Sequence, residues 1–157
     1  MKRRTLYFIL TCLAVALLLV PPGIEGKTPE KASELLEKAG RSKKALFGSA
    51  KKKRYRHNWI KCAAKYKVVY DRYPKSPSAA PALYQAADLY TRLYKYSNKS
   101  KDLDTAIALY RKLVAKHGDH FLADDAQYRI GEIYYRIKND PSQAYVEFLK
   151  VDVRFPK

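Results

Sequence analysis

Cysteine, glycine and histidine are scarce in this sequence, and their scarcity argues against several kinds of site. The chain has two cysteines, six glycines and three histidines in 157 residues. Only Cys62 lies outside the first 26 residues, so no internal disulfide is expected in the rest of the chain. The sequence contains no glycine-rich phosphate loop, no nucleophile elbow and no cluster with metal-ligand spacing. It therefore predicts no catalytic residue, no cofactor and no metal.

Long hydrophobic runs are absent except for one near the N-terminus, from Leu6 to Val20. Three basic residues at positions 2–4 precede this run, and Pro21 and Pro22 follow it. A basic start, an apolar run of about 15 residues and helix breakers are typical of a secretory signal peptide, whereas a bilayer span needs about 20 apolar residues. Residues 1–26 are predicted to be a signal peptide. Because the site after Gly26 lacks an A-x-A pattern, an uncleaved N-terminal anchor is the alternative.

Acidic residues are also few, with 15 Asp and Glu against 32 Lys and Arg, for a net charge of +17. Removal of residues 1–26 takes away three basic residues and Glu25, which leaves +15. In an exported protein this charge favours anionic wall polymers, lipid head groups and acidic protein surfaces over nucleic acid. No nucleic-acid partner is predicted.

Small and aromatic residues recur in a fixed register along the chain. A shift of about 44 positions aligns Ala64 with Ala108, Tyr66 with Tyr110, Ala79 with Ala123, Ala82 with Ala126, Tyr84 with Tyr128 and Tyr90 with Tyr134. The aromatic residues Tyr66, Tyr110 and Phe148 each follow a small residue by four positions. Eight positions after each aromatic stands a chain breaker, namely Pro74, Gly118 and Pro156. Such a period is typical of a helical repeat array.

No stretch alternates as a strand would, and helical periodicity predicts helices near 29–47, 55–73, 78–96, 102–117, 122–138 and 141–155. Thr28 as N-cap and Pro29 at the first helical position mark the start of the first helix. The predicted fold is all-α, an antiparallel solenoid of helix hairpins. The predicted divisions are 1–26, the signal segment; 27–54, an N-terminal helix and basic linker; and 55–157, the repeats.

The repeat unit resembles the tetratricopeptide (TPR) family from about Trp59 to Pro156. Its first helices carry Ala87 and Tyr90 in one copy and Gly131 and Tyr134 in the next, and its second helices carry the small–aromatic–breaker pattern. The chain departs from the family pattern at Leu83 and Gln127, where Trp is frequent, at Gly118 instead of Pro, and in a longer insertion at 95–101. The resemblance implies a non-catalytic scaffold that binds proteins.

Four segments carry two narrower resemblances. The segments at 73–84 and 120–135 are similar to exported bacterial TPR proteins of the periplasm, including outer-membrane assembly lipoproteins and the coordinator of the Tol system. The segments "KKKRYRHNWIKC" and "LYKYSNKSKDLDTAIALYRKLV" resemble the N-terminal TPR region of secreted N-acetylmuramoyl-L-alanine amidases, which act on peptidoglycan. The sequence leaves open whether the chain is a fragment of a larger amidase, a truncated gene product or a stand-alone adaptor.

Two surfaces are candidates for binding. If the geometry of the family's first helices holds, a partner protein or peptide would lie in a concave groove lined by Tyr84, Asp88, Thr91, Tyr128, Glu132 and Tyr135. The densest basic run forms a second candidate, for anionic wall polymer or lipid, made of Lys51, Lys52, Lys53, Arg54 and Arg56. The alternative for this run is a solvated helix start or linker. His117 and His120 with nearby aspartates are interpreted as turn and cap residues, not as a metal site.

The sequence thus predicts a non-catalytic TPR scaffold of the bacterial cell envelope, exported to the periplasm and serving as the N-terminal module of a peptidoglycan amidase. The alternatives are a stand-alone adaptor of the outer-membrane assembly or Tol type, and a protein that binds anionic wall polymer or lipid through its basic face. The resemblance does not identify the partner or the oligomeric state.

Overall fold

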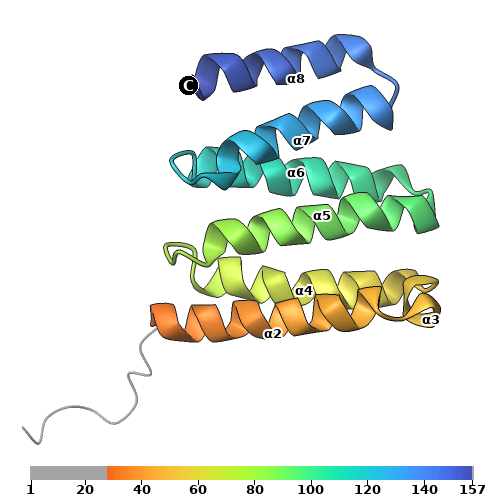
Figure 1. Cartoon of the computed structure of the whole chain (residues 1–157), viewed down its shortest axis with the longest axis vertical. Helices are drawn as coiled ribbons and strands as arrows, with labels where there is room; N and C mark the ends of the chain where they lie inside the picture. Colours follow the sequence, from red (N-terminus) through yellow and green to blue (C-terminus); the bar gives the residue numbers. More distant parts are fainter. Residues whose placement is uncertain (1–27, 157) are drawn as a thin grey trace, which may run out of the picture.

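Residues 28–156 are described by a computed structural model, and within them the chain forms seven helices and no strand. The helices are α2 (Pro29–Phe47), α3 (Ala50–Lys53), α4 (Arg56–Arg72), α5 (Ala79–Ser97), α6 (Ser100–Lys116), α7 (Leu122–Arg136) and α8 (Pro141–Arg154). The six long helices lie stacked one on the next in chain order, with alternating direction (Figure 1). The all-α hairpin solenoid predicted from the sequence is confirmed, and the short α3 is the one element that was not expected.

The stack consists of three hairpins, α2 with α4, α5 with α6, and α7 with α8. In this account α2, α5 and α7 are called the first helices, and α4, α6 and α8 the second helices. The first helix α5 contacts the next first helix, α7, as well as its own partner α6. The side of the molecule on which α2, α5 and α7 neighbour one another is called here the first-helix face.

The three second helices end in the same way, as the recurring chain breakers predict. Tyr73, His117 and Phe155 close these helices with φ of −128 to −138° and ψ of 43 to 59°, outside the helical region. The backbone N–H of each donates to the carbonyl four residues earlier. A residue before proline disfavours the α conformation, so Pro74 and Pro156 enforce this ending. Gly118 stands at the equivalent position after α6.

The helix starts follow ordinary capping chemistry. Thr28 accepts a hydrogen bond from the backbone N–H of Lys31, and Pro29 occupies the first turn of α2, as predicted. Asp140 caps α8 in the same way by accepting from the N–H of Gln143 at 2.9 Å. These side chains satisfy backbone donors that have no partner within the helix.

The core runs along the stack between the two rows of helices. Alanines with no exposed surface, among them Ala82 and Ala126, let neighbouring helices approach closely, and Tyr110 is almost fully buried. Trp59 is also buried, where its ring meets Phe47 edge-on at 5.5 Å and its indole N–H donates to the carbonyl of Lys53. Trp59, Tyr110 and Ala126 all belong to this core.

The crossing of α7 and α8 depends on a glycine. A methyl group at Gly131 would overlap the ring of Phe148, the aromatic residue of the last repeat. In the preceding repeat, the position equivalent to Gly131 is Ala87, which is fully buried. At Gly131, helix α7 therefore lies closer to α8 than an alanine would permit.

Segment 27–54 joins the stack instead of standing apart from it. Helix α2 packs on α4, and Ala39 and Leu46 of α2 belong to the same buried cluster as the repeats. It occupies the place of a first helix in a hairpin with α4. The predicted signal segment 1–26 lies outside the described residues. No helix of the described part combines the length and the apolar character that crossing a membrane requires.

Buried carboxylates join consecutive second helices. Asp102 of α6 accepts from the guanidinium of Arg56 of α4 at 2.5 and 3.1 Å and from Ser97 at 2.6 Å. Glu147 of α8 accepts from Arg111 of α6 at 2.9 Å and from Gln127 of α7 at 2.8 Å. Burial alone would raise the pKa of each carboxyl, but these hydrogen bonds outweigh it and hold both pKa values below the ordinary range.

Candidate functional site

The first-helix face is hollowed between α5 and α7. The hollow has a volume of about 440 Å³, and the half-buried or exposed side chains on its two walls are mostly polar. Tyr110 of α6 reaches it from beneath. The lining residues are Asp88, Thr91, Arg92 and Lys95 of α5, Tyr110 of α6, and Arg129, Glu132, Ile133, Arg136 and Ile137 on the α7 side. This is called the α5–α7 hollow below.

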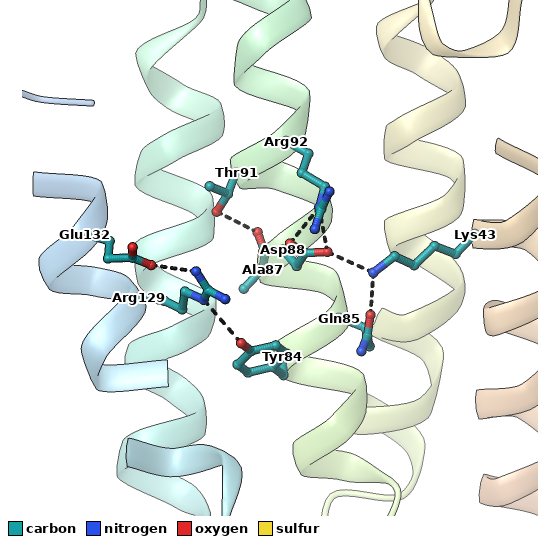
Figure 2. A network of polar contacts seen from close by, with 9 residues as sticks. All are labelled: Lys43, Tyr84, Gln85, Ala87, Asp88, Thr91, Arg92, Arg129 and Glu132. Atoms are coloured by element: carbon teal, nitrogen blue, oxygen red, sulfur yellow. Dashed lines mark hydrogen bonds and ion pairs between the residues drawn. The ribbon is translucent and has the colours of Figure 1, made fainter. Parts of the chain in front are cut away.

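The wall formed by α5 is organised around Asp88. Arg92 lies one turn further along the helix and donates to both oxygens of Asp88 at 2.8 and 3.0 Å. From the other side Lys43 of α2 donates to Asp88 at 2.8 Å and to Gln85 at 2.6 Å, as Figure 2 shows. Lys43 thus spans the space between α2 and α5, whereas nothing comparable spans the α5–α7 hollow at this level in the described residues.

The wall formed by α7 is organised around Glu132. Arg129 and Arg136 lie one turn to either side of Glu132, with N–O distances of 2.5 and 3.5 Å. Arg129 also donates from Nε to the hydroxyl of Tyr84 on α5 at 3.4 Å, so it bridges the two walls at one end of the hollow (Figure 2). Tyr84 in turn packs edge-on against Tyr110, with ring centroids 5.5 Å apart.

Charge is not balanced in the α5–α7 hollow. Four cationic side chains line it, Arg92, Lys95, Arg129 and Arg136, against the two carboxylates of Asp88 and Glu132. Each carboxylate is already shared between two cations. Asp88 pairs with Arg92 and with Lys43, and Glu132 pairs with Arg129 and Arg136. The hollow therefore presents a surplus of positive charge in a recessed place, where attraction for an anion is stronger than on an open surface.

The predicted groove residues divide into two groups. Asp88, Thr91 and Glu132 line the hollow, and Tyr84 contacts it through Arg129. Tyr128 and Tyr135 do not line it and are 47% and 60% exposed. Tyr128 packs on Phe148 of α8 at 5.2 Å, as Tyr84 packs on Tyr110, so the repeat register holds. Their ligand contact remains a prediction.

The cations of the hollow were missed by the sequence reasoning, although a signal for them exists. Arg92 follows Asp88 by four positions, and Arg129 and Arg136 flank Glu132 at three and four positions. Residues at these spacings share a face of a helix, so a face predicted to carry the acids carries these arginines too. Lys43 could not be found in this way, because it lies outside the residues assigned to the repeats.

The predicted basic patch also divides. Arg56 is engaged in the ion pair with buried Asp102, so it serves the fold. Lys51, Lys52 and Lys53 belong to α3, which is capped by Ser49, and no ion pair of theirs is found among the described residues. The run is thus a short helix and turn between α2 and α4, and whether its lysines bind a polyanion stays a prediction.

The two closely spaced histidines lie in the turn between α6 and α7. His120 accepts from the backbone N–H of Leu122 through Nδ1 at 3.1 Å and stacks on Phe121. Burial lowers the pKa of the His117 imidazole, with a smaller contribution from His120. Across residues 28–156, no group of three or more His, Cys, Asp or Glu side chains is arranged to hold a metal ion.

Comparison with known proteins supports a tetratricopeptide repeat family. Residues 81–120 and 125–157 each match the family model described as Tetratricopeptide repeat. The first match contains α5 after its first two residues and all of α6, and the second covers most of α7 and all of α8. No match to the chain is found among curated proteins or among solved structures. The repeats are of a kind that typically binds proteins and carries no catalytic residues.

Proposed function

We propose that the tetratricopeptide repeats of this chain form a protein-interaction scaffold that holds a segment of a partner protein in the α5–α7 hollow. The observation that carries this proposal is the hollow itself, a recess of about 440 Å³ with charged walls from two consecutive hairpins. Neighbouring hairpins in a repeat array create extended surfaces suited to an extended peptide. A recess with charged side chains on its walls and a buried tyrosine beneath offers both hydrogen bonds and apolar contact to such a segment.

We further propose that the scaffold works in the bacterial cell envelope, as the N-terminal module of a peptidoglycan amidase that it tethers or regulates. The support is the sequence resemblance at 51–62, 73–84 and 93–114, together with the basic and apolar N-terminal segment. A stand-alone adaptor of the outer-membrane assembly or Tol type is the second candidate. The resemblance of 73–84 and 120–135 to exported TPR proteins favours this candidate.

Site-directed photo-crosslinking in cells tests the scaffold function. A photoreactive amino acid replaces Thr91, which lines the hollow, or Ala108, which is exposed on the second helix α6. We expect the Thr91 position to crosslink one envelope protein and the Ala108 position not to do so. Absence of any crosslink at Thr91, or the same products at both positions, would remove the hollow as the binding site.

Two further measurements test the envelope assignment. Cell fractionation is expected to place the chain in the periplasmic or membrane fraction, and recovery in the cytosol contradicts export. The coding sequence downstream of Lys157 decides between the amidase module and the adaptor. A zinc-amidase domain in the same reading frame supports the first, and an adaptor is supported if the frame ends without one.

A further inference from the structure

We propose that the occupant of the α5–α7 hollow is an acidic protein segment, and that Glu132 competes with it for Arg129 and Arg136. This inference rests on the proposed scaffold function and adds the chemistry of the partner. It also assigns a role to Glu132, which would otherwise be counted as a ligand-binding group. The argument has three steps, concerning charge, exposure and the donors that remain open.

The surplus of positive charge selects for carboxylates. None of the three arginines in the hollow has a carboxylate to itself, because Asp88 is shared with Lys43 and Glu132 is shared by two arginines. Lys95 has no ion pair among the described residues. A neutral segment would leave this positive charge uncompensated, and a basic segment would be repelled by it. An acidic segment supplies the missing negative charge.

The arginines of the hollow are accessible and only partly engaged. Arg92 and Arg129 are each about half exposed at the side chain. Arg92 donates to Asp88 through Nε alone, and Arg129 uses Nε for Tyr84 and one terminal nitrogen for Glu132. A guanidinium carries five N–H donors in a planar fork that matches a carboxylate. Each arginine therefore retains N–H donors beyond those used in these bonds.

Glu132 occupies the place of a ligand carboxylate between Arg129 and Arg136. Its contacts with them are helix-surface pairs at three and four positions, of a kind that contributes little to stability when exposed. A ligand carboxylate can replace such a pair at low cost. Neutralising Glu132 removes the internal competitor and leaves both arginines in place, so the affinity for an acidic segment should rise.

Another hollow of the chain, which is rich in lysine, serves as a control. It lies beside the ends of α4 and α6 and is lined by Lys75, Lys112 and Lys116, with Asp71 among them. Lys112 lies over the ring of Tyr70 at 4.6 Å and near Asp71 at 3.8 Å. Cations in the last turn of a helix also complement its dipole, which explains Lys116 without a ligand.

The experiment measures binding of a fluorescent peptide to the full chain by anisotropy at physiological salt. The probe carries two Glu-Glu pairs joined by a Gly-Ser spacer, and the reference peptide has Gln in place of each Glu. We expect the Glu peptide to bind and the Gln peptide to bind about tenfold or more weakly, which corresponds to about 1.4 kcal/mol. Equal binding of the two peptides overturns the proposal.

Three variants locate the site on the chain. Arg92→Gln/Arg129→Gln is expected to weaken binding of the Glu peptide by about tenfold, the effect of losing one or two charge-assisted hydrogen bonds. Lys112→Gln/Lys116→Gln removes the same charge from the second hollow and is expected to change it less than about twofold. Glu132→Gln is expected to strengthen binding by about threefold or more. Circular dichroism verifies that each variant is folded.

The outcomes separate this inference from the scaffold function. Equal weakening by both double variants means that general charge attracts the peptide, and it overturns the proposal. Unchanged or weaker binding to Glu132→Gln overturns the competition. If Thr91 crosslinks a partner through a segment without acidic residues, the scaffold stands and the acidic occupant is wrong. If the Glu peptide binds in the hollow but no crosslink forms in cells, the hollow binds acids and the scaffold function fails.

Discussion

Two rows of carboxylates run along this molecule in contrasting surroundings. Asp102 and Glu147, which bond the second helices together, have side chains that are each 1% exposed. Asp88 and Glu132, on the first-helix face, are 21% and 18% exposed. All four accept hydrogen bonds from arginine or lysine, but the arginines of the buried row lie on another helix and those of the first-helix face lie on the same helix.

The difference separates the frame, meaning the buried contacts that hold the hairpins together, from the surface that can bind a partner. A buried carboxylate that loses its cation remains desolvated without compensation, so such pairs are fixed in the folded state. A pair that water reaches can exchange its partner at a cost of about 1 kcal/mol or less. The buried row thus fixes the spacing of the hairpins, and the partly exposed row pairs with cations whose acceptors a ligand can replace. Substitutions in the two rows should therefore have effects of different size.

The largest effect is expected for Asp102→Ala. The variant leaves Arg56 without its bidentate partner beside the core, and breaking a buried pair typically costs about 3 kcal/mol or more. Because Arg56 is partly exposed, we expect the low end of this range. Urea unfolding followed by circular dichroism measures the change. Asp104→Ala, on the same helix and paired with Lys138 at the surface, is the matched control and should cost less than about 1 kcal/mol.

A comparable loss for Asp102→Ala and Asp104→Ala would contradict the distinction between the two rows. It would mean that burial does not decide the contribution of these pairs. In that case the exposed pairs of the first-helix face would belong to the frame as well, and the argument for exchangeable arginines would lose its basis.

The second largest effect is expected for Gly131→Leu. Gly131 lets α7 approach α8, and through it sets the position of one wall of the α5–α7 hollow. A larger side chain must displace Phe148, which costs about 1–3 kcal/mol by overpacking. Thermal unfolding measures the shift. Gly40→Ala is the control, since nothing lies within 4 Å of the added methyl group, and it should stabilise α2 by about 0.5–1 kcal/mol.

A smaller effect is expected from acid, and it should arise in the buried row. The pKa values of Asp102 and Glu147 lie below their ordinary range in the folded protein. Their contribution to the free energy of unfolding is therefore complete above about pH 4.5 and is lost as the pH falls through the lowered values. Urea unfolding between about pH 7 and about pH 3 should show this decline. In Asp102→Asn the decline should be shallower, and an identical profile would contradict the assignment.

The sequence predicted the frame well because the frame is periodic. The alanine, aromatic and breaker positions recur with the repeat, and Tyr73, His117 and Phe155 end their helices in one conformation. The short helix α3 was missed because four residues give no period to detect. The place of α2 in the first hairpin was not assigned, because its sequence carries few of the repeat's aromatic residues.

The hollow was predicted only in part, because its depth depends on how two helices face each other. The register predicted Asp88 and Glu132 on one face, and both line the hollow. It could not show that Lys43 fills the space beside α5 on one side while the other side stays open. Nor could it show that Arg129 reaches across to Tyr84. Such contacts join residues more than 40 positions apart, and no local pattern encodes them.

The smallest effect on stability is expected for Glu132→Gln, the same substitution that should strengthen binding of an acidic segment. Its pairs with Arg129 and Arg136 are local and reached by water, so the free energy of unfolding should change by less than about 1 kcal/mol. Urea unfolding at neutral pH measures this, and Glu147→Gln is the buried counterpart, with an expected cost of about 2 kcal/mol. If Glu132→Gln lowers the free energy of unfolding slightly but raises the affinity for the acidic peptide, then Glu132 stabilises the fold at the expense of binding strength. A cost at Glu132 equal to that at Glu147 would instead place it in the frame, because only a fixed pair can contribute that much.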